Sequence, residues 1–161
     1  HTLSLHDALP IWSAVRASAM ALTPDEWTFI TSLDGCSQLG LRAGHFYTGD
    51  ANGPRRLVDP ANPIGMLPLL ERSWSVAMVQ LAEKNVELGL APGTLEALVP
   101  WRRLPLVASE FPGDYWALLA VEWLAAMPVA DRDMTALQRF SISRSVTQRT
   151  RHRARRILQS S

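Results

Sequence analysis

The fold is decided by one stretch, residues 115–127, which reads YWALLAVEWLAAM. Its apolar side chains cover nearly the whole circumference of a helix, with Trp116 and Trp123 on one side and Leu118 and Val121 on another. A helix that is apolar on all sides lies at the centre of a domain and has neighbours on several faces. We therefore expect a helical domain that is built around residues 115–127.

Helical patterns continue on both sides of this segment. Apolar residues at three- and four-residue spacing predict a long helix over about 66–88, and a capping box that begins at Thr23 predicts a helix that ends at Asp34. Shorter helices are expected over about 94–99, 100–110, 131–140 and 145–159. Gly and Pro interrupt residues 35–64, of which residues 44–48 are the most strand-like part. The predicted fold class is therefore all-α, a helical bundle or short α-solenoid of helical hairpins with one long irregular loop at about 35–64.

Composition bounds the class of protein. Hydrophobic residues make up 47% of the 161 residues and charged residues 19%, as in a globular domain. No apolar run approaches the ~18 residues that cross a bilayer, so we expect no membrane segment. The single cysteine, Cys36, excludes an internal disulfide framework and favours a reducing compartment, which predicts a cytoplasmic protein. Arg far outnumbers Lys, a skew that is typical of GC-rich bacterial genomes.

The first eleven residues, HTLSLHDALPI, resemble a translated sequencing adapter. Residues 2–11 can be encoded by ACT CTT TCC CTA CAC GAC GCT CTT CCG ATC, which is similar base for base to a common short-read library adapter. We therefore interpret residues 1–11 as an adapter-derived artefact, and residues 12–161 as a single, N-terminally truncated helical domain from a metagenomic fragment. His1, His6 and Asp7 are accordingly excluded as ligands or catalytic groups.

Residues 100–158 alternate short helix and turn twice. The phrases YWALLAVEWL at 115–124 and QRTRHRARRIL at 148–158 each resemble the inner helix of an α-solenoid repeat of the HEAT or armadillo kind. The resemblance covers a little over a third of the chain. It implies a scaffold or binding function along a curved surface, as such families generally have. The leading prediction is therefore a non-catalytic helical interaction or scaffold module with a protein partner.

The C-terminal segment is the candidate binding site. Residues 139–161 hold seven Arg and no acidic residue, a charge of +7, whereas the remaining residues sum to −6. The candidate anion- or partner-binding residues of the last predicted helix are Arg149, Arg151, His152, Arg153, Arg155 and Arg156.

Three interpretations of this basic segment stay open. It is the solvated face of an amphipathic helix, a surface that contacts nucleic-acid phosphates through residues 139–161, or a docking site for an acidic partner. Association with nucleic acid is the alternative function, although no aromatic residue follows Phe140 to stack on bases.

Glu122 stands alone among the apolar residues of the central segment. Such a carboxylate is either a general acid or base in a buried site, or one partner of an ion pair with an arginine such as Arg102, Arg103 or Arg153. We favour the ion pair, because it is the more common arrangement.

The remaining candidates for chemistry are weak. Cys36 and His45 lie in the turn-rich segment, and their separation matches no structural zinc spacing. The sequence holds no Walker loop and no GxGxxG, HExxH or GxSxG motif. We therefore expect no enzymatic activity, no catalytic or metal-binding residue and no cofactor.

Overall fold

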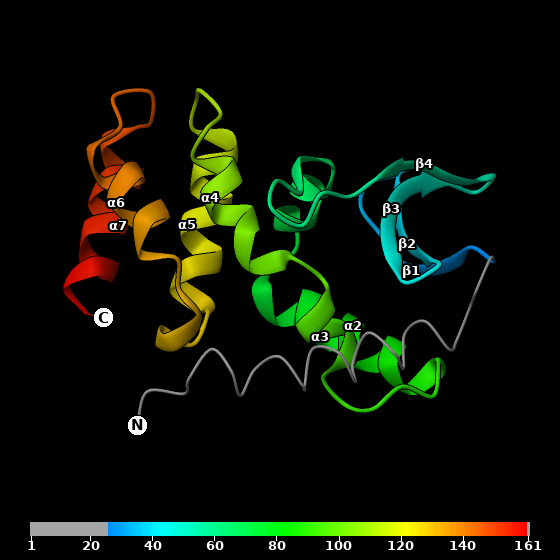
Figure 1. Cartoon of the computed structure of the whole chain (residues 1–161). Helices are drawn as coiled ribbons and strands as arrows, with labels where there is room; N and C mark the ends of the chain where they lie inside the picture. Colours follow the sequence, from blue (N-terminus) through cyan, green and yellow to red (C-terminus); the bar gives the residue numbers. More distant parts are fainter. Residues whose placement is uncertain (1–25, 161) are drawn as a thin grey trace. The chain divides into compact units, whose positions relative to one another are not determined.

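The computed structural model describes residues 26–160 (Figure 1). The chain divides into two compact units, each made of two separate chain segments. Of the described residues, the first unit holds 26–57 and 79–99, and the second holds 58–78 and 100–160. Helix α2 (Trp74–Glu87) is continuous and contributes residues to both units. No helix within residues 26–160 has both the length and the apolar character that a bilayer-spanning segment requires.

The first unit contains a four-stranded antiparallel sheet with the strand order β1-β2-β3-β4. The strands are β1 (Thr28–Ser32), β2 (Gln38–Arg42), β3 (His45–Asp50) and β4 (Gly53–Leu57). The prediction of an all-α fold is therefore wrong, since the protein combines a sheet with helices. The irregular loop predicted at about 35–64 is also wrong, because β2, β3 and β4 lie within it. The short strand expected over residues 44–48 is confirmed as part of β3.

The helix predicted from residue 23 to residue 34 is replaced by strand β1, apart from residues 23–25, which lie outside the described residues. Its central residues, Thr28, Phe29, Ile30 and Thr31, are β-branched or aromatic. Such side chains lose rotamer freedom in a helix and pack well on a pleated sheet. The capping-box pattern is a local signal, and pairing with β2 overrides it.

Two tight turns set the register of the first three strands. After β1, Oδ1 of Asp34 accepts hydrogen bonds from the N–H groups of Cys36 (2.9 Å) and Ser37 (2.6 Å). These two hydrogen bonds lower the pKa of Asp34 to about 2. Between β2 and β3, Ala43 and Gly44 both have positive φ angles, of 50° and 74°. Two consecutive positive φ angles are the geometry of the type I′ turn, which matches the twist of a hairpin.

The C-terminal part of α2 and the short helix α3 (Thr94–Leu98) complete the described part of the first unit. Asn85 of α2 is 1% exposed. Its Oδ1 accepts a hydrogen bond from the N–H of Leu95 (2.9 Å), and its Nδ2 donates to the carboxylate of Glu96. The N-cap residue of α3 is Gly93, which has no side chain to do this. Asn85 therefore caps α3 from the neighbouring helix.

The long helix predicted over 66–88 is two elements. A 3₁₀ segment, η1 (Ile64–Glu71), is followed by Arg72 in an extended conformation (φ −89°, ψ 152°). The hydroxyl of Ser73 then accepts a hydrogen bond from the N–H of Val76 (3.4 Å) at the start of α2. Pro68 inside η1 lacks an N–H donor, which favours a short 3₁₀ segment over a continuous α-helix.

The described part of the second unit is helical. Besides η1 and the first turns of α2, its elements are η2 (Trp101–Arg103), α4 (Leu104–Ala108), α5 (Tyr115–Ala126), η3 (Val129–Asp131), α6 (Met134–Ile142) and α7 (Gln148–Gln159). Helix α5 packs against η1, α4, α6 and α7 (Figure 1). Within this unit, the predicted central position of residues 115–127 is confirmed.

A tryptophan cluster lies in the core of the second unit. The ring centroid of Trp74 is 4.3 Å from that of Trp101 and 5.5 Å from that of Trp123. The indole N–H of Trp123 donates to the carbonyl oxygen of Arg72 (2.6 Å), which satisfies the only polar atom of that buried ring.

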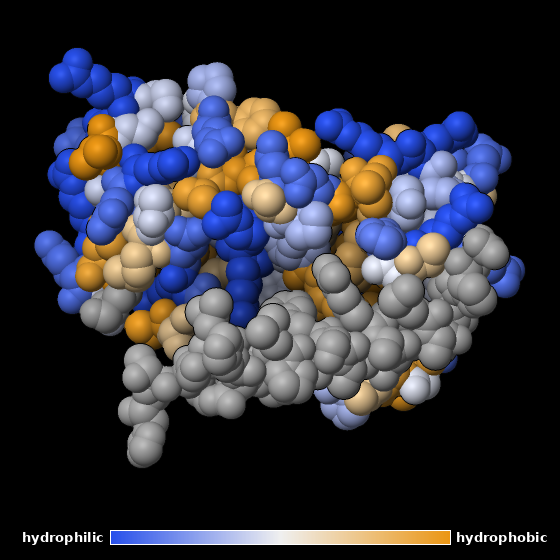
Figure 2. Space-filling view, viewed as in Figure 1, coloured by the Kyte–Doolittle hydropathy of each residue, from blue (hydrophilic) through white to orange (hydrophobic). Residues whose placement is uncertain are grey.

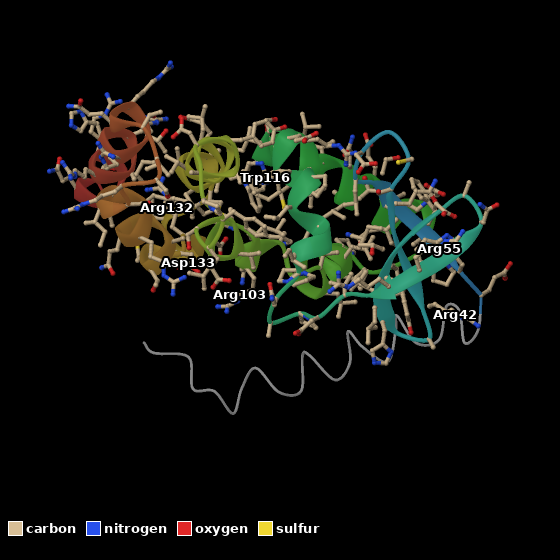
Figure 3. The ribbon with its side chains drawn as sticks, turned by 90° about the horizontal axis from the view of Figure 1, so that it is seen from above. Arg42, Arg55, Arg103, Trp116, Arg132 and Asp133 are labelled. Carbon is tan, nitrogen blue, oxygen red and sulfur yellow. The ribbon has the colours of Figure 1, made fainter. Side chains whose placement is uncertain are left out.

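The connection from α5 to α6 uses adjacent residues of opposite charge (Figure 3). The guanidinium group of Arg132 donates to the carbonyl oxygens of Ala125 and Met127, each at 3.2 Å, at the C-terminal end of α5. The carboxylate of Asp133 accepts from the N–H of Ala136 (2.9 Å) at the start of α6. Each charge thus has the sign that stabilises its helix end.

Candidate functional site

Helix α7 forms because one stripe of its residues is apolar or small. Thr150, Ala154 and Ile157 follow a four- and three-residue spacing and are buried. The helix packs against α6 and α5 with this stripe. Its N-cap is Thr147, whose hydroxyl accepts a hydrogen bond from the N–H of Thr150 (3.3 Å). The last helix, predicted from about residue 145, therefore begins at Gln148.

Asp114, just before α5, binds the start of α7 through hydrogen bonds. Its carboxylate accepts hydrogen bonds from the N–H of Thr147 (2.8 Å) and from the hydroxyl of Thr147 (3.1 Å). Burial alone would raise the pKa of Asp114, but hydrogen bonds from Thr147 and Thr150 and the charge of Arg149 outweigh that effect. The pKa of Asp114 is therefore lowered, and the ionised carboxylate stabilises the α5–α7 contact.

Three of the predicted binding residues interact with the protein itself. Arg151 donates to the carbonyl oxygens of Ser143 (3.2 Å) and Val146 (2.7 Å). Arg155 donates through Nε to the carbonyl oxygen of Ser141 (3.1 Å). These hydrogen bonds join α7 to α6 and to the loop that precedes α7.

Arg153 forms the third of these interactions. Its Nε and Nη2 atoms donate to the two carboxylate oxygens of Glu122, at 3.1 and 3.2 Å. The favoured interpretation of Glu122, an ion pair with an arginine, is thus confirmed with Arg153 as the partner. Arg102, another arginine considered for this role, pairs instead with Asp131 (2.9 Å).

The side chains on the outer face of α7 point away from the core. Arg149, His152, Arg155 and Arg156 are exposed, and among the described residues they line an open hollow of about 480 Å³. They fall on one side of the helix, opposite the buried stripe. Hydrophilic residues gather over the end of the second unit where α6 and α7 lie (Figure 2). We name these four residues the α7 basic face.

Apart from the attraction between Arg149 and Asp114, which acts over a longer distance than an ion pair, the α7 basic face has little internal neutralisation. Within residues 26–160, no carboxylate lies within salt-bridge distance of Arg149, Arg155 or Arg156. Like charges one helical turn apart repel one another, so this face lowers the stability of α7. An anionic ligand would relieve that repulsion, which makes the face a candidate anion-binding site.

The other sequence candidates are not brought together. Cys36 is an exposed free thiol in the turn after β1. His45 is exposed at the start of β3, where its Nδ1 lies 2.9 Å from the carbonyl oxygen of Ala43. Among the described residues, no group of three or more His, Cys, Asp or Glu side chains is placed to hold a metal ion.

The face of the sheet opposite the buried side chains of Leu39 and Leu41, here called the outer face, was not predicted from the sequence. The strand register places Phe29, Gly40, Tyr47 and Leu57 in one row across β1, β2, β3 and β4. The available signal was the alternation in residues 38–42, where buried Leu39 and Leu41 alternate with the other side chains.

Comparison of this chain with protein-family models, with curated proteins and with solved structures found no match. The resemblances of residues 100–158 to α-solenoid repeats and of residues 1–11 to a sequencing adapter therefore stay predictions. The function must therefore be inferred from two surfaces, the α7 basic face and the outer face of the sheet.

Proposed function

We propose that this protein is a non-catalytic interaction module of the cytoplasm, and that the α7 basic face binds an acidic segment of a protein partner. The observation that carries the proposal is the exposure of Arg149, His152, Arg155 and Arg156 around one hollow. A cytoplasmic location suits the exposed thiol of Cys36, because a reducing compartment keeps such a thiol free.

The chemistry of the face favours carboxylates as its ligand. Guanidinium groups bind carboxylates through paired N–H donors, and the resulting charge-assisted hydrogen bonds are stronger than neutral ones. Arg149 and Arg156 are separated by about 10 Å along the helix, at a rise of about 1.5 Å per residue. A partner helix with acidic residues at three- and four-residue spacing would match that interval.

Two features favour a protein over nucleic acid at this face. A protein that binds duplex DNA tightly can neutralise about six to ten phosphates, whereas three arginines and one histidine line the hollow among the described residues. None of these four is aromatic, so the face has no ring on which an unpaired base would stack. Nucleic acid remains the alternative that the experiment distinguishes.

The test is binding of a fluorescent ten-residue polyglutamate peptide to the full chain, measured by anisotropy at 50 mM salt. The variant Arg149→Gln/Arg155→Gln/Arg156→Gln should weaken binding about 3- to 150-fold, since each of the three exposed ion pairs contributes about 0.2–1 kcal/mol. The control replaces three exposed arginines outside the face, Arg103, Arg139 and Arg144, with Gln and has the same net charge.

Two results would contradict this proposal. Equal weakening in the test and control variants would mean that net charge, and not the α7 basic face, attracts the peptide. Tighter binding of a 12-nucleotide oligothymidylate than of polyglutamate, lost in the same test variant, would instead favour the nucleic-acid alternative.

A further inference from the structure

We infer that the outer face of the sheet in the first unit is a stacking platform for single-stranded nucleic acid. This surface is separate from the α7 basic face and does not depend on the function proposed for it. The argument starts from the strand register, which brings aromatic side chains from different strands into one row.

The row is continuous across the sheet. Phe29 pairs with Gly40, Gly40 pairs with Tyr47, and Tyr47 pairs with Leu57. Side chains of directly paired residues lie on the same face, about 4.5–5.5 Å apart. Phe29, Tyr47 and Leu57 therefore form one row with a gap at the glycine.

The indole of Trp27 fills that gap. A Cβ atom at Gly40 would collide with the six-membered ring of Trp27, so the ring lies directly on the glycine. Its neighbours in the row are then Phe29 and Tyr47. We name Trp27, Phe29 and Tyr47 the aromatic row.

The aromatic row is accessible. Phe29 is 39% exposed and Leu57, at the end of the row, is 53% exposed. Trp27 and Tyr47 are half-buried. Leu39, Leu41 and Phe46, by contrast, are buried, as expected for the opposite face of the same strands. The outer face thus exposes ring surface that the core does not use.

Positive charge lies beside the aromatic row. Arg42 pairs with His45 across β2 and β3, two residues along from Gly40 and Tyr47 and hence on the same face. Both are exposed, and Arg42 projects from the sheet (Figure 3). The ammonium group of Lys84 lies 5.2 Å from the ring centroid of Phe29 and is itself paired with the carboxylate of Glu87 (2.6 Å), so Arg42 is the cation that a phosphate would meet here.

The strand pairs that flank the row add no negative charge to it. The neighbouring pairs on this face, Arg42 with His45 and Gln38 with Gly49, contain no carboxylate. A proline-rich peptide also docks on aromatic side chains, but such a peptide carries no phosphate with which Arg42 would pair. Stacking rings beside cations suit unpaired bases joined by phosphates, and a row of this size accommodates two or three bases.

The test is anisotropy of a fluorescein-labelled 12-nucleotide oligothymidylate with the full chain at 50 and 200 mM salt. Tyr47→Leu should raise the Kd about 5- to 150-fold, because it removes one stacking ring, whereas Tyr47→Phe keeps the ring and should bind like the wild type. Phe29→Leu should resemble Tyr47→Leu. Val86→Ala is the control, since it shortens an apolar side chain that is 79% exposed outside the row.

Charge supplies a second readout. Arg42→Gln should reduce the dependence of log Kd on log salt by about 0.7, the value for one phosphate contact with a single strand. Ultraviolet cross-linking of the oligonucleotide to the wild-type chain, followed by mass spectrometry, should modify peptides that contain Phe29 or Tyr47. This measurement needs no variant, so it holds even if a substituted chain fails to fold.

Each contrary result overturns the inference. Absence of oligonucleotide binding at 50 mM salt would do so, as would equal binding by Tyr47→Leu and Tyr47→Phe. Loss of binding only in the triple α7 variant would assign the nucleic-acid contact to the α7 basic face. Preferential binding of a proline-rich peptide, sensitive to Tyr47→Leu, would assign the aromatic row to a protein ligand.

Discussion

Replacing Asn85 with Ala tests whether a side chain from α2 holds α3 in place. The Asn85 amide is 1% exposed and joins the backbone N–H of Leu95 to α2 through a 2.9 Å hydrogen bond. Alanine removes that acceptor and leaves the N–H of a residue that is 0% exposed without it. A buried donor left unsatisfied costs about 1–3 kcal/mol, and the carboxylate of Glu96 loses a donor as well.

The expected loss in the free energy of unfolding is therefore about 2 kcal/mol. With a urea m-value of about 2 kcal/mol/M, the unfolding midpoint should fall by about 1 M. The assay is urea unfolding followed by circular dichroism. Asn52→Ala is the matched control, because Asn52 is exposed in the turn after β3, and its stability should change by less than about 0.5 kcal/mol. A loss below about 0.5 kcal/mol in Asn85→Ala as well would refute the capping role.

Three further substitutions test the sheet and the packing of α7. Gly40→Ala should displace the indole packed on it, which lowers the melting temperature and shifts tryptophan emission, whereas Gly35→Ala, with open space around its Cβ position, should do neither; unchanged emission in Gly40→Ala would contradict this packing. Because the pKa of Asp114 is lowered on folding, its contribution to stability is present above its unfolded value of about 3.9 and is lost as pH falls through the lower folded value. Stability of Asp114→Asn should therefore depend less on pH than that of the wild type as the pH falls below about 4, as measured by thermal unfolding, and parallel curves would count against it. A double-mutant cycle of Glu122→Gln and Arg153→Gln should give a coupling of about 1 kcal/mol or less, since both side chains are substantially exposed; a coupling above about 2 kcal/mol would show that the pair is shielded from solvent.

Helix positions were predictable where the signal is local. Residues 115–127 are apolar nearly all round and form α5, apart from Met127, and the helix expected over about 131–140 is α6, which begins after its N-cap Asp133. Both results depend on side chains within a few residues of one another. The capping box at Thr23 is equally local, yet β1 follows it, because a strand is stabilised by a partner elsewhere in the chain.

The residues of the candidate site could be predicted from the sequence, but the partners and the exposure of their side chains could not. The sequence identified five arginines and His152 of the last helix, but not which of them face solvent. Arg153 is directed to Glu122, 31 residues earlier, whereas Arg155 stays exposed although its Nε donates to the carbonyl oxygen of Ser141. Such pairings depend on how α7 lies against α5 and α6, which its own sequence does not encode. The aromatic row was not predicted for a related reason, since Trp27 and Phe29 meet Tyr47 only through the pairing of β1, β2 and β3.

The interleaving of the two units has a consequence for the order of folding during synthesis. The hairpins of the sheet involve only neighbouring strands, so they can pair once residue 57 has left the ribosome. The same unit still lacks residues 79–99, which emerge only after the first segment of the other unit. Because domains generally fold as units during translation, the first unit becomes complete only after about forty further residues, or roughly 2–8 s at 5–20 residues per second. No single cut in the chain separates the two units, so a fragment that ends after β4 would be expected to aggregate during expression.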